Sequence, residues 1–421
     1  MLVSDRLKWL VVLGGLALLL PGLPALLGVC GVAVMMLDGD PEALNFSLSW
    51  FLFLAVTLGG GGAIFFHGVR SLGGRSSGRL RLPPAWALGG GFFVALAVGL
   101  GLRSARLLAL PGFPPVFVAA ALLPPVAAVA WMMDRRPGDL TWRRAVVAFA
   151  AGATVSVGLI LVLEVLLPGV VLALVWGLAD LALPAVERLI DALAGGNVAT
   201  ALTSPGFLFA MIELAVIAPL VEEFVKPLVT LPLLKRLEHP RDALLIGAIA
   251  GAGFAVVENA IYAGLGLRLW AGILLVRALG AAIHPVGAGL TAWGWRELLR
   301  GRPGAGRRWL ERYGLAVGIH ALWNGGSLLV LTLVGANFFG RPQPEVDVLG
   351  VTAGGILLAL LAVEGAAVWA GARALARRLL PSEAVLPERG TVSMERAVAV
   401  WALICLLVLV PVGLAALRSA W

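Results

Sequence analysis

Glu222, Glu223 and Lys226 lie within five positions of one another in a largely apolar stretch that begins near Phe207. On an α-helix, Lys226 lies about 40° around the axis from Glu222 and about 60° from Glu223, so the three side chains share one face. Each such charge costs roughly 2.5 to 3.5 kcal/mol at the middle of a membrane. Because packing does not require that cost, the cluster predicts a functional site.

Three apolar stretches further along the chain add the other residue types that water activation needs. Glu258 lies on the first, Arg277 and His284 are seven residues apart on the second, and His320 and Asn324 are four apart on the third. Residues at these two spacings share a helix face. A carboxylate base, a cation, an imidazole and an amide donor for an oxyanion together favour hydrolysis.

The same residues also fit a purely structural network. Glu222 or Glu223 would pair with Lys226, Glu258 would pair with Arg277, and the histidines would hydrogen-bond neighbouring helices. We favour the catalytic interpretation because all four residue types occur on adjacent stretches, and because charges inside a membrane are usually functional.

Two prolines and three glycines bear on how these helices pack. Pro227 and Pro285 cannot donate to the carbonyls one turn before them, which predicts loosened helices beside the charged residues. Freed carbonyls at that depth need protein or cavity water, and a hydrolase needs water. The stretch 243–266 is expected to pack closely on a neighbour through its small residues Gly247, Gly251 and Gly253.

The composition is that of a polytopic membrane protein. The 421 residues are 60% hydrophobic and 13% charged, with a mean hydropathy of +0.97, which excludes a water-soluble fold of this size. Cys30 and Cys405 lie in apolar runs, so neither a disulfide framework nor a cysteine zinc site is supported.

Apolar stretches of about 20 residues predict an all-α transmembrane bundle of about eleven spans. These are 9–37, 44–67, 83–102, 107–133, 145–167, 207–234, 243–266, 269–295, 313–335, 350–372 and 397–417. The segment 169–194 carries charges at helical spacing and is expected to lie at the membrane interface.

The basic residues predict the orientation of the bundle. Most of the 32 lysines and arginines fall in the loops that are cytoplasmic if the N-terminus is cytoplasmic. We therefore attribute the net charge of +8 to the basic residues of cytoplasmic loops, and we expect no binding to nucleic acid. We expect a multi-pass protein of the cell membrane, in contact with the lipid bilayer.

Four regions follow from this division. Residues 1–144 form N-terminal transmembrane helices of unknown role, and 145–206 form a span with the interfacial helix. Residues 207–335 form a four-helix core that carries the polar groups, and 336–421 form C-terminal transmembrane helices.

The core motifs resemble those of a known family. Glu222-Glu223-x-x-Lys226, then Phe254-x-x-x-Glu258, then a histidine on the next span are similar to the motif set of the PrsW intramembrane proteases, relatives of the CAAX prenyl endopeptidase (Abi) superfamily. The resemblance covers about residues 207–335. It implies hydrolysis of a peptide bond in a membrane-anchored protein, and some relatives cut a membrane-anchored anti-sigma factor.

The resemblance also implies roles for the matching residues. Glu222 and Glu223 would be the catalytic carboxylates, Glu258 a third essential acid and His284 the essential imidazole, with Lys226 and Arg277 in support. His320 and Asn324 resemble the HxxxN element whose residues stabilise the oxyanion in the CAAX enzymes. That pattern has a histidine where this chain has Glu258.

The sequence leaves the metal open. Relatives are often labelled metalloproteases, and Glu222, Glu258, His284 and His320 offer nitrogen and oxygen ligands. However, no HExxH motif is present, and a glutamate base that acts directly on water needs no metal. We favour the glutamate mechanism without a cofactor, with a divalent metal such as zinc as the other reading.

A second function class uses the same residues. Buried carboxylates also form proton relays, so the alternative is a proton-coupled membrane transporter.

Overall fold

The computed structural model describes residues 5–28, 31, 34–35, 43–104, 106–134, 140–166, 198–339, 348–379, 400–405 and 407. These residues are nearly all helical and contain no strand beyond an isolated antiparallel bridge between Arg79 and Thr141. The predicted all-α class is therefore confirmed for the described residues.

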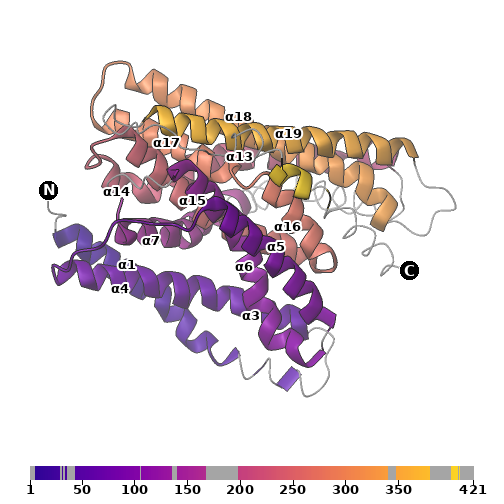
Figure 1. Cartoon of the computed structure of the whole chain (residues 1–421), viewed down its shortest axis with the longest axis horizontal. Helices are drawn as coiled ribbons and strands as arrows, with labels where there is room; N and C mark the ends of the chain where they lie inside the picture. The colour runs from indigo at the N-terminus through magenta and orange to yellow at the C-terminus, as the bar shows by residue number, and fades with distance from the viewer. Residues whose placement is uncertain are drawn as a thin grey trace.

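Figure 1 shows the order of the helices along the described parts of the chain. They are α1 (Asp5–Ala25), α3 (Ala43–Leu54), η1 (Ala55–Gly60), α4 (Gly61–Leu72), α5 (Ala85–Ser104), α6 (Arg106–Met133), α7 (Trp142–Ala151), η2 (Gly152–Ser156), α8 (Val157–Leu161), η3 (Val162–Leu166), α11 (Val198–Thr203), α12 (Pro205–Ile212), η4 (Glu213–Ile217), α13 (Ala218–Val225), η5 (Lys226–Thr230), α14 (Leu231–Leu234), α15 (Pro240–Leu265), η6 (Leu267–Leu269), α16 (Trp270–Leu279), α17 (Ile283–Leu299), α18 (Ala305–Phe339) and α19 (Val348–Arg378).

Eight of the described helical stretches are long and apolar enough to cross a membrane, and α16 with α17 forms a bent pair that brings the total to nine. The chain is thus a multi-pass membrane protein. The expected span 207–234 is divided among five short helices, from α12 to α14. The segment 169–194 and most of 397–417 lie outside the described residues, so the count of eleven and the cytoplasmic N-terminus stay predictions.

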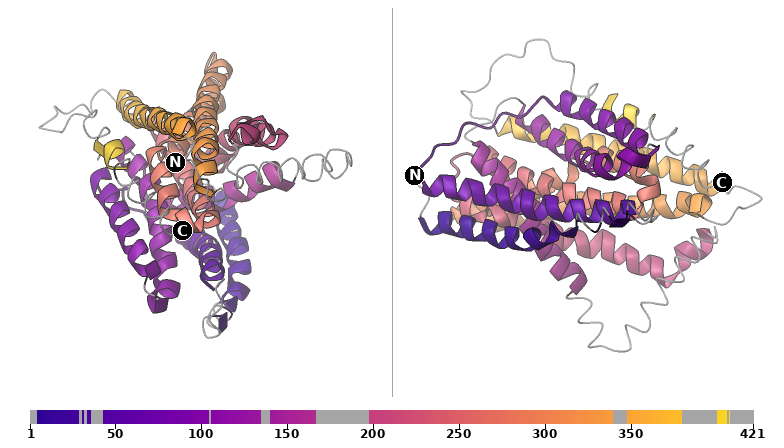
Figure 2. Two further views of the ribbon diagram at one scale, coloured as in Figure 1. Left: turned by 90° about the vertical axis from the view of Figure 1, so that its right-hand side faces the viewer. Right: turned by 90° about the horizontal axis from the view of Figure 1, so that it is seen from below.

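Helix α15 is the central element of the fold. Of its most apolar window 83% is buried, the largest share among the candidate spans. It packs against α6, α7 and α17, while α1 with α4 and α5 with α6 form two further pairs (Figure 2). Helices α18 and α19 run along the opposite side (Figure 1). A helix buried on all sides explains why its sequence is small and apolar around most of its circumference.

Small residues allow α15 to approach its neighbours, as the sequence predicted. A Cβ atom at Gly251 would overlap the carbonyl oxygen of His284 on α17, and one at Gly253 would overlap the carbonyl oxygen of Phe149 on α7. Gly247 likewise faces α17. These contacts hold α17, and with it His284, directly against α15.

The two expected helix interruptions are present. α13 ends at Val225 and continues as the 3₁₀ helix η5, which contains Pro227. α16 and α17 meet at a bend of 40° just before Pro285, so the expected span 269–295 is two helices. The missing proline N–H groups account for both interruptions.

The contact at Gly251 makes a prediction about stability. Gly251→Ala should lower the free energy of unfolding by about 1 to 3 kcal/mol, because the added methyl group must push α15 away from α17. Gly264→Ala on the same helix is the control, since its Cβ meets only Leu48 at 3.9 Å. That control should be neutral or stabilising by up to about 1 kcal/mol. Thermal unfolding of the purified protein measures both, and equal stability of the two variants would contradict this packing.

Candidate active site

Four helical segments bring the predicted site residues together. Glu222 and Glu223 come from α13, Lys226 begins η5, His284 is the second residue of α17, and His320 lies on α18. Each of these five residues is at most 5% exposed. Residues almost 100 positions apart therefore share one buried cluster.

Lys226 lies at the centre of this cluster. Its Nζ is 2.7 Å from Glu222 Oε2, 2.8 Å from Glu223 Oε1 and 2.8 Å from His284 Nδ1. It also lies 4.5 Å from the ring centroid of Phe254, within reach of a cation–π interaction. Because an ammonium group only donates, the Nδ1 atom of His284 is assigned as the acceptor.

The other nitrogen of His284 is held by an acid on α15. His284 Nε2 lies 2.8 Å from Glu258 Oε2, so this N–H donates to the carboxylate. Arg277 Nη2 lies 2.6 Å from the same oxygen, and Arg277 Nε donates to the side-chain oxygen of Asn259. Asn259 in turn donates to the carbonyl oxygen of Ala121 on α6 at 3.2 Å. The orientation of His284 is thus tied to α6, α15 and α16.

Asn259 was missed by the sequence analysis. It directly follows Glu258 on a central helix and is buried. A buried side-chain amide needs a donor for its oxygen and an acceptor for its NH₂ group. An asparagine in an apolar helix therefore indicates polar partners on neighbouring helices, and this is the signal in the sequence that points to Asn259.

A second acid holds His320 in the same way. His320 Nδ1 lies 2.9 Å from Glu223 Oε1, which assigns the proton to this nitrogen. Asn324 Nδ2 lies 3.1 Å from His320 Nε2 and also donates to the carbonyl oxygen of Leu214 at 2.9 Å. In this arrangement Asn324 orients His320, and its role as an oxyanion donor stays a prediction.

Three ligand atoms converge inside the cluster. Glu222 Oε2 lies 3.8 Å from His284 Nδ1 and 3.9 Å from His320 Nε2, and all three atoms lie within 4.8 Å of one another. Two histidines and a glutamate form a known zinc donor set. Each imidazole also gives its outer N–H to a carboxylate, as metal-binding histidines usually do. The residues therefore fit a divalent metal ion.

Glu258 occupies a different place from the other candidate ligands. Its Oε2 accepts from His284 Nε2 and Arg277, on the side of the imidazole that faces away from Glu222. The group of convergent ligand atoms contains Glu222, His284 and His320 but not Glu258. Its geometry is that of a residue that positions a ligand.

Residues 140–340 match the family model described as PrsW family intramembrane metalloprotease. The PrsW match supports an intramembrane peptidase and gives the transporter alternative no support. No curated protein and no solved structure matches the chain. The further relation to the CAAX superfamily stays a prediction.

The PrsW match begins earlier than the resemblance over residues 207–335. It includes α7 and η2, which contact the site from the other side of α15. Ser156 of η2 donates its hydroxyl to the carbonyl oxygen of Lys226 at 3.3 Å, and Gly253 allows α7 to approach. These contacts explain structurally why the matched region starts at residue 140.

The support of Glu258 by Arg277 can be tested through stability. Arg277→Met should destabilise the protein by about 3 to 5 kcal/mol, because it leaves the mostly buried Glu258 carboxylate without its cation. Arg268→Met, at an exposed position in η6 two residues before α16, is the control and should change stability by less than about 0.5 kcal/mol. The double variant Arg277→Met/Glu258→Gln should lose less free energy of unfolding than the sum of the losses in the two single variants. Strict additivity in thermal unfolding would show that the two side chains do not interact.

Proposed function

We propose that the chain is an intramembrane endopeptidase whose reacting water lies where Glu222 Oε2, His284 Nδ1 and His320 Nε2 converge. The observation that carries this proposal is the approach of these three atoms to within 4.8 Å, with both outer imidazole nitrogens bound to carboxylates. The PrsW match supports peptide-bond hydrolysis as the chemistry.

We propose further that Glu222, His284 and His320 hold a divalent metal such as zinc. A metal bound there supplies Lewis-acid chemistry, which polarises the peptide carbonyl and lowers the pKa of water. The preference for a mechanism without a cofactor rested on the missing HExxH motif. That motif supplies two ligands from one helix, whereas here the three ligands come from three separate helices, so no local pattern marks them.

The remaining carboxylates prepare the site. Glu258 and Glu223 keep the imidazole protons on the outer nitrogens, so that the lone pairs of His284 and His320 point inward. Glu223 also has a second oxygen, Oε2, that is buried without a hydrogen-bond partner among the described residues. We assign this second oxygen to accept the proton of the attacking water, because Lys226 and His320 both bind Oε1 and leave Oε2 without a partner in the described part of the chain.

Lys226 supplies positive charge at the reacting centre. Its ammonium lies within 2.8 Å of Glu222, Glu223 and His284, so it offsets the negative charge of the acids. The same charge can stabilise the oxygen of a peptide carbonyl as it becomes negative. The substrate we propose is a membrane-anchored protein, with an anti-sigma factor as the example that the sequence resemblance suggests.

Glu222 is the first test of the active-site assignment. Glu222→Gln should reduce cleavage of a membrane-anchored substrate by about 10²-fold or more, because it removes the carboxylate at the convergence point. Glu311→Gln is the control, since Glu311 is exposed on α18 and its ion pair among the described residues is with Arg307, at 2.8 Å. The control should cleave normally. Unchanged turnover by a well-folded Glu222→Gln protein would end this assignment.

Metal content is the second test, and it is independent of any substrate. Purified protein should hold about one divalent ion per chain, and Glu222→Gln should lose it. Glu258→Gln should bind the ion about 10- to 100-fold more weakly, as expected for a partner of a ligand. Lys226→Met should bind it more tightly, because the ammonium lies within 2.8 Å of two of the three ligand atoms.

Elemental analysis and metal titration measure these changes, and Glu311→Gln again serves as the control. If the protein is metal-free and cleaves substrate fully in the presence of a chelator, the glutamate mechanism without a metal is correct instead. The peptidase assignment would survive that result.

A further inference from the structure

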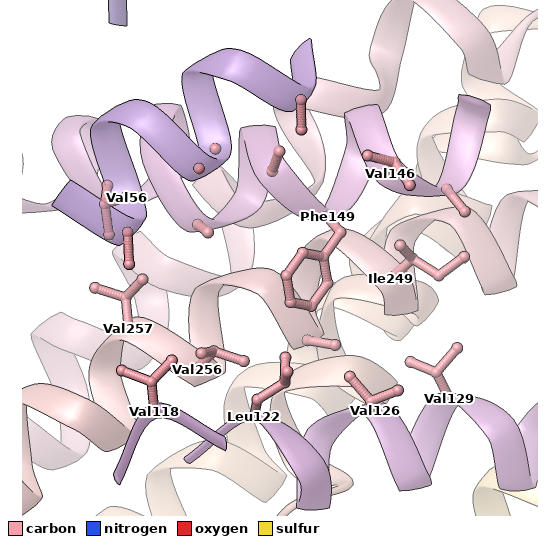
Figure 3. A pocket seen from close by; sticks show the side chains of 18 of the residues that line it. Val56, Val118, Leu122, Val126, Val129, Val146, Phe149, Ile249, Val256 and Val257 are labelled. Carbon is pink, nitrogen blue, oxygen red and sulfur yellow. The ribbon is translucent and has the colours of Figure 1, made fainter. Parts of the chain in front are cut away.

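An apolar cavity of about 490 Å³ lies between the N-terminal helices and the core. Its walls are α3, η1 and α4 on one side, α6 on the other, and α7 with α15 behind. Figure 3 shows Val118, Leu122, Val126 and Val129 in a row along α6, with Phe149 across the space from them. The side chains that line it are almost all aliphatic or aromatic, and the cavity is partly open.

The dimensions of the cavity fit one hydrocarbon chain. Its lining on α15 runs from Ile249 to Ile261, which corresponds to about 18 Å along the helix axis. The apolar lining of the cavity offers water no hydrogen bonds, so hydrocarbon suits it better than water.

One end of the cavity is basic. Leu80, Leu82 and Trp142 line it there. The segment around Leu80 is fixed to the start of α7, because Leu80 N donates to the carbonyl oxygen of Leu140 at 2.9 Å and Trp142 N donates to that of Gly78 at 3.0 Å. The cavity thus ends at a platform formed by two backbone segments, 78–82 and 140–142, that are hydrogen-bonded to each other.

Two arginines alternate with the leucines of this platform. Arg79 and Arg81 are exposed, whereas Leu80 is 1% exposed. No ion pair of either arginine occurs within the described part of the chain, so their charges are available to an anion. Nearby, Arg143 donates to the carbonyl oxygen of Arg75 at 2.5 Å, which adds a further positive charge to the same end.

We propose that this cavity binds one acyl chain of an anionic phospholipid, whose phosphate lies against Arg79 and Arg81. The second acyl chain stays in the bilayer through the open side of the cavity. An acyl chain gains little free energy when it moves from the bilayer into an apolar protein cavity. Selectivity for one lipid must therefore come from the charge of its headgroup and from the fit of its acyl chain. The lipid fills the space between the N-terminal helices and the α7–α15 pair, and so completes the contact of these helices with the core.

The test measures which phospholipids stay bound to the detergent-purified protein, by native mass spectrometry after incubation with phosphatidylglycerol or with phosphatidylcholine. The wild-type protein should retain more phosphatidylglycerol than phosphatidylcholine. Arg79→Gln/Arg81→Gln should reduce this preference about thirtyfold, because each basic residue at an anionic lipid surface contributes about fivefold. Arg302→Gln/Arg307→Gln removes the same charge from exposed positions elsewhere and should leave the preference unchanged.

A second variant tests the cavity itself. Gly59 lines the cavity and has no neighbouring atom within 4 Å of a Cβ, so Gly59→Phe should fill the space and abolish retention of both lipids. Gly90→Phe on α5 is the control, because Gly90 is equally open but does not line the cavity. Retention that is the same for wild type and Gly59→Phe, or equal retention of the two lipids by the wild type, would overturn the proposal.

Discussion

The burial of the Lys226 ammonium is the interaction on which the rest of the structure depends. A charge removed from water at this depth costs several kcal/mol unless partners of opposite charge meet it. Glu222 and Glu223 meet it within a single helical turn, which needs no other part of the fold. The third partner, His284, comes from a different helix. Folding must therefore bring α17 against α13, and this requirement explains the small residues where α15 and α17 touch.

The helix breaks serve the same requirement. A regular helix through residue 227 would continue α13 past the site unchanged, but the 3₁₀ turn at Lys226 and Pro227 alters the direction of the side chains there. The bend between α16 and α17 places His284 at a helix start, close to Arg277 on the preceding helix. Gly287 then leaves room for the Glu223 carboxylate, which a Cβ atom at this position would overlap. Regular α-helical hydrogen bonds are lost at these breaks, and the altered helix directions place Lys226, Glu223 and His284 in contact.

Local patterns predicted much of this arrangement, and contacts between helices account for what they missed. The apolar stretches gave the all-α class, and the spacing of Glu222, Glu223 and Lys226 gave their shared face. The ninth span was expected to start at 313, whereas helix α18 starts at Ala305, because a helix continues through polar residues that an apolar window excludes. The pairing of Glu258 with His284, and of Glu223 with His320, depends on rotamers and helix orientation that no short motif records.

The balance of charge at the site argues for the kind of ligand that it binds. Three carboxylates, Glu222, Glu223 and Glu258, face two cations, Lys226 and Arg277, while the two imidazoles are assigned as neutral. The cluster thus has a formal charge of −1, in surroundings where water screens little. Such a site repels an anion and attracts a cation. In the present arrangement the acceptor nitrogen of each imidazole already has a donor, Lys226 at His284 Nδ1 and Asn324 at His320 Nε2. A cation that enters must therefore replace these two donors, while the outer N–H groups of both imidazoles stay on their carboxylates.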